Sequence, residues 1–471
     1  MDKSFGDLRE ISDKEGALGK PIRTISWKDT LYFELDHLFF GDEQGTVAKE
    51  LCELSSGTNL LRPQSVFLDS LDRDAINWSN LNRYSGPLGD NLLRMATQIY
   101  EETLKGGPLD KVECAMTAGA AEGLRLVFQY LSYKGARRVL VLGPQYSIVF
   151  QNITLAGLEF QELFGDPNHG FLPSVEVIRD AIRRTGADVI FMTQPNNPSG
   201  TQYSEEELGR IVDEAKATGA WVVFEKIGSD IALGSSAFQN FSSVFEKYDA
   251  WDSVFVVDSF SKRRPVSGFR LGYVLAAPSF LEFVVERRFG DCPPLVARDG
   301  FLRDLLYSAA IHVRTLGREN DSMNYLRSVI NSMPVDIKDE ILAVAQNELH
   351  RHEQELREMY NTIWENREFL FSTMRNYLIG YTALDDGSNF LASFRVPQHL
   401  SDERTFAVKL FEQERLASYP LGCFTADPEI ARKFSKNGQI WLRISCGIEP
   451  KIFKEIVFRL CRFLEKSALT K

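Results

Sequence analysis

Four apolar runs in the middle of the chain have the character of buried β-strands. They are RRVLVLG (137–143), DVIFMTQ (188–194), WVVFE (221–225) and SVFVVDS (253–259). Longer amphipathic segments separate these runs, so short strands and helices alternate along this part of the chain. The alternation predicts an α/β fold.

The stretch SEEELGRIVDEAKATG predicts a helix over residues 204–219, between the second and third strands. Ser204 and Glu207 have the spacing of a capping box at its start, and Gly219 suits its end. One face of the helix is apolar and consists of Leu208, Ile211, Val212 and Ala215. Strand, helix and strand in this order predict a mostly parallel central sheet flanked by helices. Ligands of such sheets gather at the carboxyl ends of the strands.

A long amphipathic pattern over residues 337–375 predicts a helix that ties a large domain to a smaller one. We expect residues 1–60 to form an N-terminal segment that belongs to the small domain. Residues 61–345 would form the large domain, and residues 346–471 a small C-terminal α/β domain. Residues 285–340 are helical and charged in pattern, and their sequence indicates no chemistry.

Composition narrows the range of functions. Of the 471 residues, 44% are hydrophobic and 25% are charged, which is an ordinary globular balance. The net charge is −11 and no Lys/Arg-rich block stands out, so we expect no nucleic-acid partner. An acidic protein can still bind small anions in a local cationic pocket.

Cysteine usage and hydropathy predict a cytosolic location. The six cysteines are scattered without a CxxC pair, which argues against a zinc site or a disulfide framework and favours a reducing compartment. The first residues, MDKSFGDLREISDKEG, lack the apolar core of a signal peptide. No run reaches the ~18 apolar residues that a membrane span requires. We therefore expect neither a membrane association nor a metal site.

The segment SFSKRRPVSGFRLG (259–272) places a lysine at the end of the fourth strand. A lone lysine at a strand end is commonly a solvated side chain. Here Ser259 and Ser261 supply hydroxyl groups, and Arg270 is a planar donor suited to phosphate. Lys262 could therefore form an imine with an aldehyde while its neighbours hold an anionic group. The same residues would suit any anion site.

Two further motifs have both a structural and a chemical interpretation. QPNNPSG (194–200) is a typical turn sequence, or a turn that directs the amide of Asn197 at a ligand. MTAGAAEGLRLVF (116–128) is a plain helix start, or a helix N-terminus that binds phosphate through backbone N–H groups. Those N–H groups would belong to Gly119, Ala120 and Ala121. Taken alone, neither motif decides between its two interpretations.

The order of the motifs carries more information than any single motif. TAGAAEG, GPQY (143–146), QPNNPSG, SFSKRRPVSGFRLG and WLRISCG (441–447) follow one another along the chain. An earlier stretch, NRYSGPLGDNLLRMA (82–96), contains a Tyr-x-x-x-x-Gly pattern. In this order the chain resembles the fold-type-I pyridoxal-phosphate enzymes, and within them the class I/II aminotransferase family. The matches extend from about residue 55 to 450.

The resemblance implies a binding site for pyridoxal 5′-phosphate. Lys262 would be the Schiff-base lysine and would then carry a proton to and from the substrate Cα. The cofactor phosphate would be held by Gly119, Ala120, Ala121, Ser259, Ser261 and Arg270. Tyr84 would reach the phosphate in a neighbouring subunit, which implies a homodimer with shared active sites.

The resemblance also implies contacts to the cofactor ring and to the substrate. Tyr146 would stack on the pyridine ring, although a core aromatic residue would fit the sequence equally well. Asn197 would donate to the phenolic oxygen of the ring and help to bind the substrate. Arg443 would hold the substrate α-carboxylate by a bidentate pair. An arginine on the apolar strand IWLRIS is costly without an anionic partner, which favours this role.

Two positions depart from the family pattern. The family has Asp-x-x-Tyr at a point that corresponds to Glu225 and Gly228. The family aspartate keeps the pyridine nitrogen protonated, and a glutamate can do so on a stem that is one methylene longer. Alternatively, Glu225 pairs with Lys226 or another cation and is structural. Glycine in place of the tyrosine removes one hydrogen-bond donor to the phenolic oxygen.

These observations predict a pyridoxal-phosphate-dependent aminotransferase that acts on an α-amino acid through a Schiff base and a quinonoid. The alternative is a non-transaminating enzyme of the same family that carries out elimination, replacement, cyclisation or C–C bond formation. A non-enzymatic binder with the same fold is a third possibility, against which Lys262, Arg270 and Arg443 all argue. The sequence does not identify the side chain of the substrate.

Overall fold

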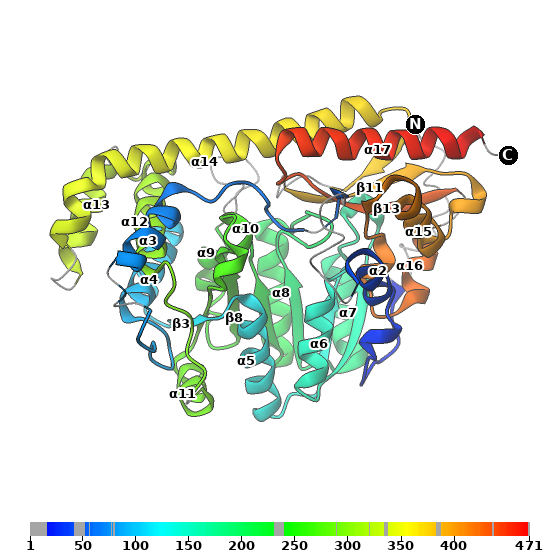
Figure 1. Cartoon of the computed structure of the whole chain (residues 1–471). Coiled ribbons are helices and arrows are strands. Elements are labelled where there is room, and N and C mark those ends of the chain that lie inside the picture. Colours follow the sequence, from blue (N-terminus) through cyan, green and yellow to red (C-terminus); the bar gives the residue numbers. More distant parts are fainter. Residues whose placement is uncertain are drawn as a thin grey trace.

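The computed structural model describes residues 17–41, 52–55, 57–76, 78, 81–229, 240–288, 290–319, 321–333, 338–382, 388–435 and 438–469. Its centre is an eight-stranded sheet with the strand order β1-β5-β4-β6-β7-β8-β9-β3 (Figure 1). In that order the strands are Ala17–Leu18, Glu159–Phe164, Arg138–Leu142, Val189–Thr193, Trp221–Glu225, Val254–Ser259, Gly272–Ala276 and Glu113–Thr117.

The sheet is mostly parallel, as the sequence predicted. Strands β5, β4, β6, β7 and β8 run in the same direction. Strand β9 is antiparallel to both of its neighbours, and β1 is antiparallel to β5. The four strands predicted from apolar runs are β4, β6, β7 and β8, which lie next to one another. Their carboxyl ends therefore meet at one edge of the sheet.

Helices cover both faces of the sheet, which explains why the strands are apolar throughout. In β7, Val222 and Phe224 belong to one hydrophobic core, and Val223 to the core on the opposite face. The first core includes residues of α4 (Asn91–Lys105), α7 (Val175–Thr185), α8 (Glu205–Thr218) and α9 (Phe241–Lys247). The second includes residues of α5 (Ala120–Tyr133), α6 (Ser147–Leu155) and α11 (Pro278–Arg287).

Helix α8 begins and ends as its sequence predicted. The Ser204 hydroxyl accepts from the backbone N–H of Glu207 at 3.2 Å, and the Glu207 carboxylate accepts from the N–H of Ser204 at 2.8 Å. Gly219 follows in the left-handed conformation, with φ 75°. The capping box and the glycine stop are both confirmed.

A second group of elements contains the C-terminal part of the chain. Its three-stranded antiparallel sheet has the order β10-β11-β13, formed by Leu378–Tyr381, Asn389–Arg395 and Gln439–Ser445. Helices α15 (Glu403–Glu414), α16 (Pro428–Phe434) and α17 (Pro450–Leu469) surround it, together with α2 (Leu31–Phe40) (Figure 1). The short strand β2 (Cys52–Glu53) pairs with β12 (Leu416–Ala417). The chain therefore returns near its end to residues close to its beginning.

The predicted long helix is α14, Lys338–Met374. It runs along the top of the molecule in Figure 1, from α13 (Ser322–Ser332) to α17. The predicted domain boundary near residue 345 falls inside this helix, and the division into domains stays a prediction. Among the helices of the described ranges, none has the length and apolar character that crossing a bilayer requires.

The segment 285–340 contributes to the scaffold beneath the candidate site. Its main element is α12 (Arg298–Thr315), which is buried along most of its length and packs against α4 and α3 (Ser65–Ile76). Asp304 on α12 accepts from the Arg264 Nε at 2.5 Å and lies 3.3 Å from the Nε2 atom of His352. Because Arg264 follows Lys262 by two residues, this buried ion pair anchors the chain next to Lys262.

Candidate active site

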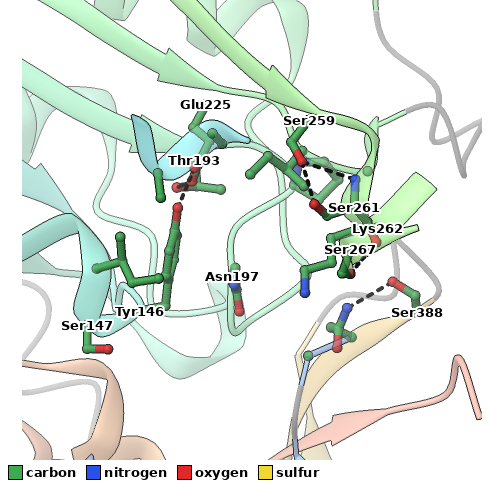
Figure 2. Close-up of a pocket in the computed structure, with 18 of the residues that line it drawn as sticks. Tyr146, Ser147, Thr193, Asn197, Glu225, Ser259, Ser261, Lys262, Ser267 and Ser388 are labelled. Atoms are coloured by element: carbon green, nitrogen blue, oxygen red, sulfur yellow. Dashed lines mark hydrogen bonds between the residues drawn. The ribbon is translucent and has the colours of Figure 1, made fainter. Parts of the chain in front are cut away.

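One cavity of about 230 Å³ lies at the carboxyl ends of β6, β7 and β8. All the site residues predicted from the sequence line it, except Gly119 and Tyr84. They come from the central sheet, from the helix starts around it and from β13 of the smaller sheet. Figure 2 shows Lys262 and Asn197 extending into this space from different segments.

The first part of the site is built for an anion. Ser259 ends β8, and its hydroxyl donates to the Ser261 hydroxyl at 2.8 Å (Figure 2). Ala120 and Ala121 begin α5, where the first backbone N–H groups of a helix have no partner within it. Arg270 brings a guanidinium to the same edge. The helix N-terminus and this cation together favour a phosphate or a similar group.

Gly119 does not line the cavity, but it makes the approach of Arg270 possible. It is the residue before α5, with φ 80°, and no side chain caps the helix there. A Cβ atom at this position would lie 2.8 Å from the Nη2 atom of Arg270. Any larger residue would therefore push the guanidinium away from the helix start.

Lys262 lies on the single turn α10 (Phe260–Arg263) directly after β8. Its Nζ donates to the Thr58 hydroxyl at 3.3 Å, and its backbone carbonyl accepts from the Asn59 amide at 3.0 Å. Burial, reinforced by the positive charges of Arg443 and Arg270, lowers the pKa of Lys262 to about 8. The unprotonated, nucleophilic amine is therefore far more populated near neutral pH than in an ordinary lysine.

Glu225 ends β7 and is fully buried at the base of the cavity. Its Oε1 accepts from the Tyr146 hydroxyl at 2.5 Å, and its Oε2 lies 2.9 Å from the Thr193 hydroxyl (Figure 2). Burial raises the pKa of Glu225 to about 7, although the contacts with Tyr146 and Thr193 oppose this shift. A weakly ionised carboxyl at this position can pair with a cationic group that enters the cavity.

The alternative that Glu225 pairs with Lys226 is wrong. Lys226 directly follows β7 and does not line the cavity. Its Nζ lies 2.6 Å from Glu101 and 3.8 Å from Asp258, in a buried group beneath the site. Tyr273 donates to Asp258 at 2.7 Å in the same group. These contacts hold the end of β8, which leads into the lysine turn.

Arg443 is buried on β13 and reaches the cavity from the smaller sheet. Its Nε donates to the Ser55 carbonyl at 2.9 Å, and its Nη2 donates to the same oxygen. Its Nη1 donates to the Asn197 side-chain oxygen at 3.1 Å. The guanidinium carbon lies 4.5 Å from the ring centroid of Phe424. These contacts fix the plane of the guanidinium and leave one N–H on each terminal nitrogen.

Tyr84 is 91% exposed and does not reach the cavity of its own chain. Gly228 lines the cavity and adopts φ 84°. A tyrosine would be strained in this left-handed conformation, so the departure at residue 228 changes the backbone as well as the side chain. Asp230, which the sequence also offers as a weaker candidate for the role of the family aspartate because its offset differs, lies outside the described residues.

The fold brings to the site several residues that were not predicted from the sequence. Thr58 and Asn59 contact Lys262, Thr193 contacts Glu225, and Gln145 contacts Thr193. The remaining missed lining residues include Tyr32, Ser147, Ile148, Ser267, Ser388, Asn389 and Phe424. Thr193, Gln145, Ser147 and Ser267 lie next to or inside the motifs described above, and this proximity was the only available signal. The others lie in segments without such a motif.

Comparisons with known proteins agree on one family. The family described as aminotransferase class I and II matches residues 49–460. An aspartate aminotransferase of Thermotoga maritima is 26% identical over 240 residues, which cover 50% of this chain and 61% of that protein. A probable aspartate/prephenate aminotransferase of Aquifex aeolicus is 28% identical over 207 residues, which cover 43% of this chain and 51% of that protein. The chain thus spans about half to three fifths of the length of these curated relatives.

Solved structures show the fold over a greater length. The aspartate aminotransferase of Thermus thermophilus with maleate superimposes with a TM-score of 0.69 and covers 94% of this chain and 100% of its own. An aminotransferase from Mycobacterium tuberculosis superimposes with a TM-score of 0.68 and covers 92% and 96%. The sequence identities are only 17% and 19%, so these likenesses concern the fold.

Proposed function

The chain belongs to the aminotransferase class I and II family, whose enzymes depend on pyridoxal 5′-phosphate, and we propose that it transfers the amino group of an α-amino acid to an oxo acid. The observation that carries this proposal is the meeting of Lys262, Glu225 and Arg443 around one cavity. The matched relatives are named as aminotransferases, so they do not favour elimination, replacement, cyclisation or C–C bond formation.

The donor set of the cavity fits pyridoxal phosphate. Ser259, Ser261, Arg270 and the start of α5 would hold the phosphate, and Lys262 would bind the aldehyde carbon. Glu225 would pair with the ring nitrogen, Asn197 would donate to the ring oxygen, and Tyr146 would cover a ring face. When bound, the cofactor supplies an electron sink for the bonds at the substrate Cα.

The side chains of the chain would supply binding and proton transfer. Arg443 would bind the substrate α-carboxylate through its two remaining N–H groups. Lys262, once free, would take a proton from the substrate Cα and return one at the reacting carbon. Its lowered pKa supports this role, because an amine that ionises near the working pH both accepts and gives up a proton readily.

Two measurements test this proposal. The purified protein should convert an oxo acid into the corresponding amino acid when a second amino acid is supplied as the amino donor. Chromatography of the products measures this conversion. Borohydride reduction and peptide mapping should then find the cofactor attached to Lys262, and Lys262→Ala should abolish both attachment and transfer. Ammonia release without a new amino acid would contradict the proposal.

We also propose an uncharged, aromatic or aliphatic side chain for the preferred substrate. Among the lining residues that the structure describes, the cations are Lys262, Arg270 and Arg443, and each already has a proposed role. Tyr32, Ile148 and Phe424 contribute apolar surface instead. Phenylalanine or leucine should therefore react with a higher kcat/KM than aspartate. A preference for aspartate would contradict this proposal without affecting the reaction type.

A homodimer with shared sites is part of the proposal. Support comes from an exposed apolar segment near Tyr84, in which Ile76 is 80% and Trp78 66% exposed. Several exposed apolar side chains of this size in one part of the surface are typical of a face that a partner covers. Tyr84 would then reach the phosphate in the partner's cavity. We place the protein in the cytosol, because the six cysteines, all of them within the described residues, are not joined in disulfides.

A further inference from the structure

Three buried side chains form a row at the base of the cavity: Glu225, Thr193 and Gln145. Thr193 and Glu225 face each other as the last residues of the neighbouring parallel strands β6 and β7. The Thr193 hydroxyl oxygen lies 2.9 Å from Glu225 Oε2 and 2.9 Å from the side-chain oxygen of Gln145. Figure 2 shows Thr193 directly beside Glu225.

The orientation of the Gln145 amide is determined by its other contact. Its Nε2 donates to the Leu142 carbonyl at 2.9 Å, which leaves Oε1 facing Thr193. If the amide were turned over, two oxygens would face each other at the Leu142 carbonyl. Gln145 therefore offers Thr193 an acceptor and no proton.

Counting protons decides the state of Glu225. The Thr193 hydroxyl has a single proton but faces an acceptor on each side. With an ionised Glu225, one of the two 2.9 Å contacts would be oxygen against oxygen, and a buried acceptor would lack a donor. With a proton on Oε2, Glu225 donates to Thr193 and Thr193 donates to Gln145. Both contacts are then hydrogen bonds, and Oε1 still accepts from Tyr146.

We propose that Thr193 and Gln145 are positioning residues that hold Glu225 as a neutral carboxylic acid in the cofactor-free protein. The other groups that face Glu225 do not reverse this. Tyr146 precedes α6 and is a neutral donor, and Asp258 on β8 opposes ionisation. Lys262 on α10 favours ionisation, but its contribution is smaller than that of burial, and the pKa of Glu225 rises to about 7.

The consequence for cofactor binding rests on the proposed function. A protonated ring nitrogen placed against Glu225 favours the carboxylate. The O–H bond of Glu225 then breaks, its proton goes to solvent, and the carboxylate keeps the electron pair. Thr193 can turn its own proton toward Oε2. Cofactor binding would therefore release a proton from Glu225 below about pH 7.

The test uses the full chain freed of cofactor and measures the free energy of unfolding by denaturant between pH 5 and 8. The unfolded carboxyl ionises near its ordinary pKa of 4.5, whereas the folded one stays neutral to about 7. The stability from the neutral acid is therefore fully present below pH 4.5 and is lost as pH rises to about 7. Relative to Glu225→Gln, the folding equilibrium constant of the wild type should fall roughly 40-fold from pH 5 to pH 7.

A variant that leaves Glu225 unchanged tests the role of Gln145. Gln145→Met removes the competing acceptor, so that Thr193 can donate to an ionised Glu225. The midpoint of the profile, meaning the pH at which the carboxyl of Glu225 is half ionised in the folded protein, should therefore move to lower pH. Thr193→Val should abolish this shift, whereas Thr193→Ser should preserve it. A midpoint that stays or rises in Gln145→Met, or a shift that persists with Thr193→Val, would overturn the proposal.

An infrared measurement keeps the proposal testable if those variants do not fold. The spectrum of the cofactor-free wild type at pH 6, minus that of Glu225→Gln, should contain the carbonyl band of a protonated carboxyl group. Its absence would overturn the proposal. Both measurements leave the cofactor out, so a failed aminotransferase assay and a failed Glu225 assignment would be separate results.

Discussion

Arg443 offers the most direct test of how the site recognises a substrate. Its contacts to Ser55 and Asn197 use three of the five guanidinium N–H groups, and the other two lie on neighbouring nitrogens. A carboxylate accepts such a pair side by side. A hydrogen bond to a charged group is worth about 1.5–3 kcal/mol, so the pair is worth about 3–6 kcal/mol. Arg443→Leu should then lower kcat/KM roughly 150- to 25,000-fold.

The assay compares an amino acid with the amine that has the same side chain but no carboxylate. Arg443→Leu should lose most of its reactivity toward the amino acid and little toward the amine, measured by cofactor absorbance in single turnovers. Arg443→Lys keeps the charge but not the planar fork, so its loss should be intermediate. Arg432→Leu is the matched control, because Arg432 is exposed on α16 and pairs only with Glu429 in the described contacts.

An equal loss for the amino acid and the amine would refute this reasoning. Such a result would mean that Arg443 acts through packing against Phe424 and Ser55, and not through the carboxylate. Circular dichroism and the thermal midpoint of each variant would show whether the fold had changed. A variant that folds as the wild type does makes the comparison decisive.

Three further predictions concern other parts of the molecule. The pKa of Lys262 is lowered to about 8, so the rate of cofactor uptake by cofactor-free protein should rise about tenfold per pH unit up to that value. Stopped-flow absorbance measures this rate, and a rate that keeps rising to pH 10 would show an ordinary lysine. Asp304→Asn should lower the free energy of unfolding by about 3–5 kcal/mol in denaturant titrations, because Arg264 would stay buried without its counter-charge; a loss near zero would show that the pair contributes little. Mixing Tyr84→Ala and Lys262→Ala chains should give more activity than either variant alone, because one site of each mixed dimer would be intact. Activity no greater than that of the separate variants would argue against shared sites.

Local patterns were sufficient for the elements that hold the site. The apolar runs at 221–225 and 253–259 predicted β7 and β8, because a strand covered on both faces has few polar positions. Ser204, Glu207 and Gly219 predicted both ends of α8, because capping depends on residues only a few positions apart. Such signals are contained within a few residues of sequence.

The hydrogen-bond partners of the site could not be predicted in the same way. Glu225 could have paired with Lys226, but Lys226 pairs with Glu101, more than a hundred residues away in sequence. The contact between Thr193 and Glu225 depends on the register of two strands that α8 separates. A register is a property of the assembled sheet, and no single segment encodes it.

The sequence by itself therefore determined the functional groups of the site: which residues carry an amine, a guanidinium or a carboxyl, and in what order they follow one another. Folding added their neighbours and, with them, their ionisation. The amine of Lys262 ionises near pH 8 because burial and the charge of Arg443, from a distant segment, disfavour its charge, and nearby Arg270 adds to the effect. Those contacts arise only when segments far apart in sequence pack around one cavity, since burial and electrostatic interactions depend on distance in space.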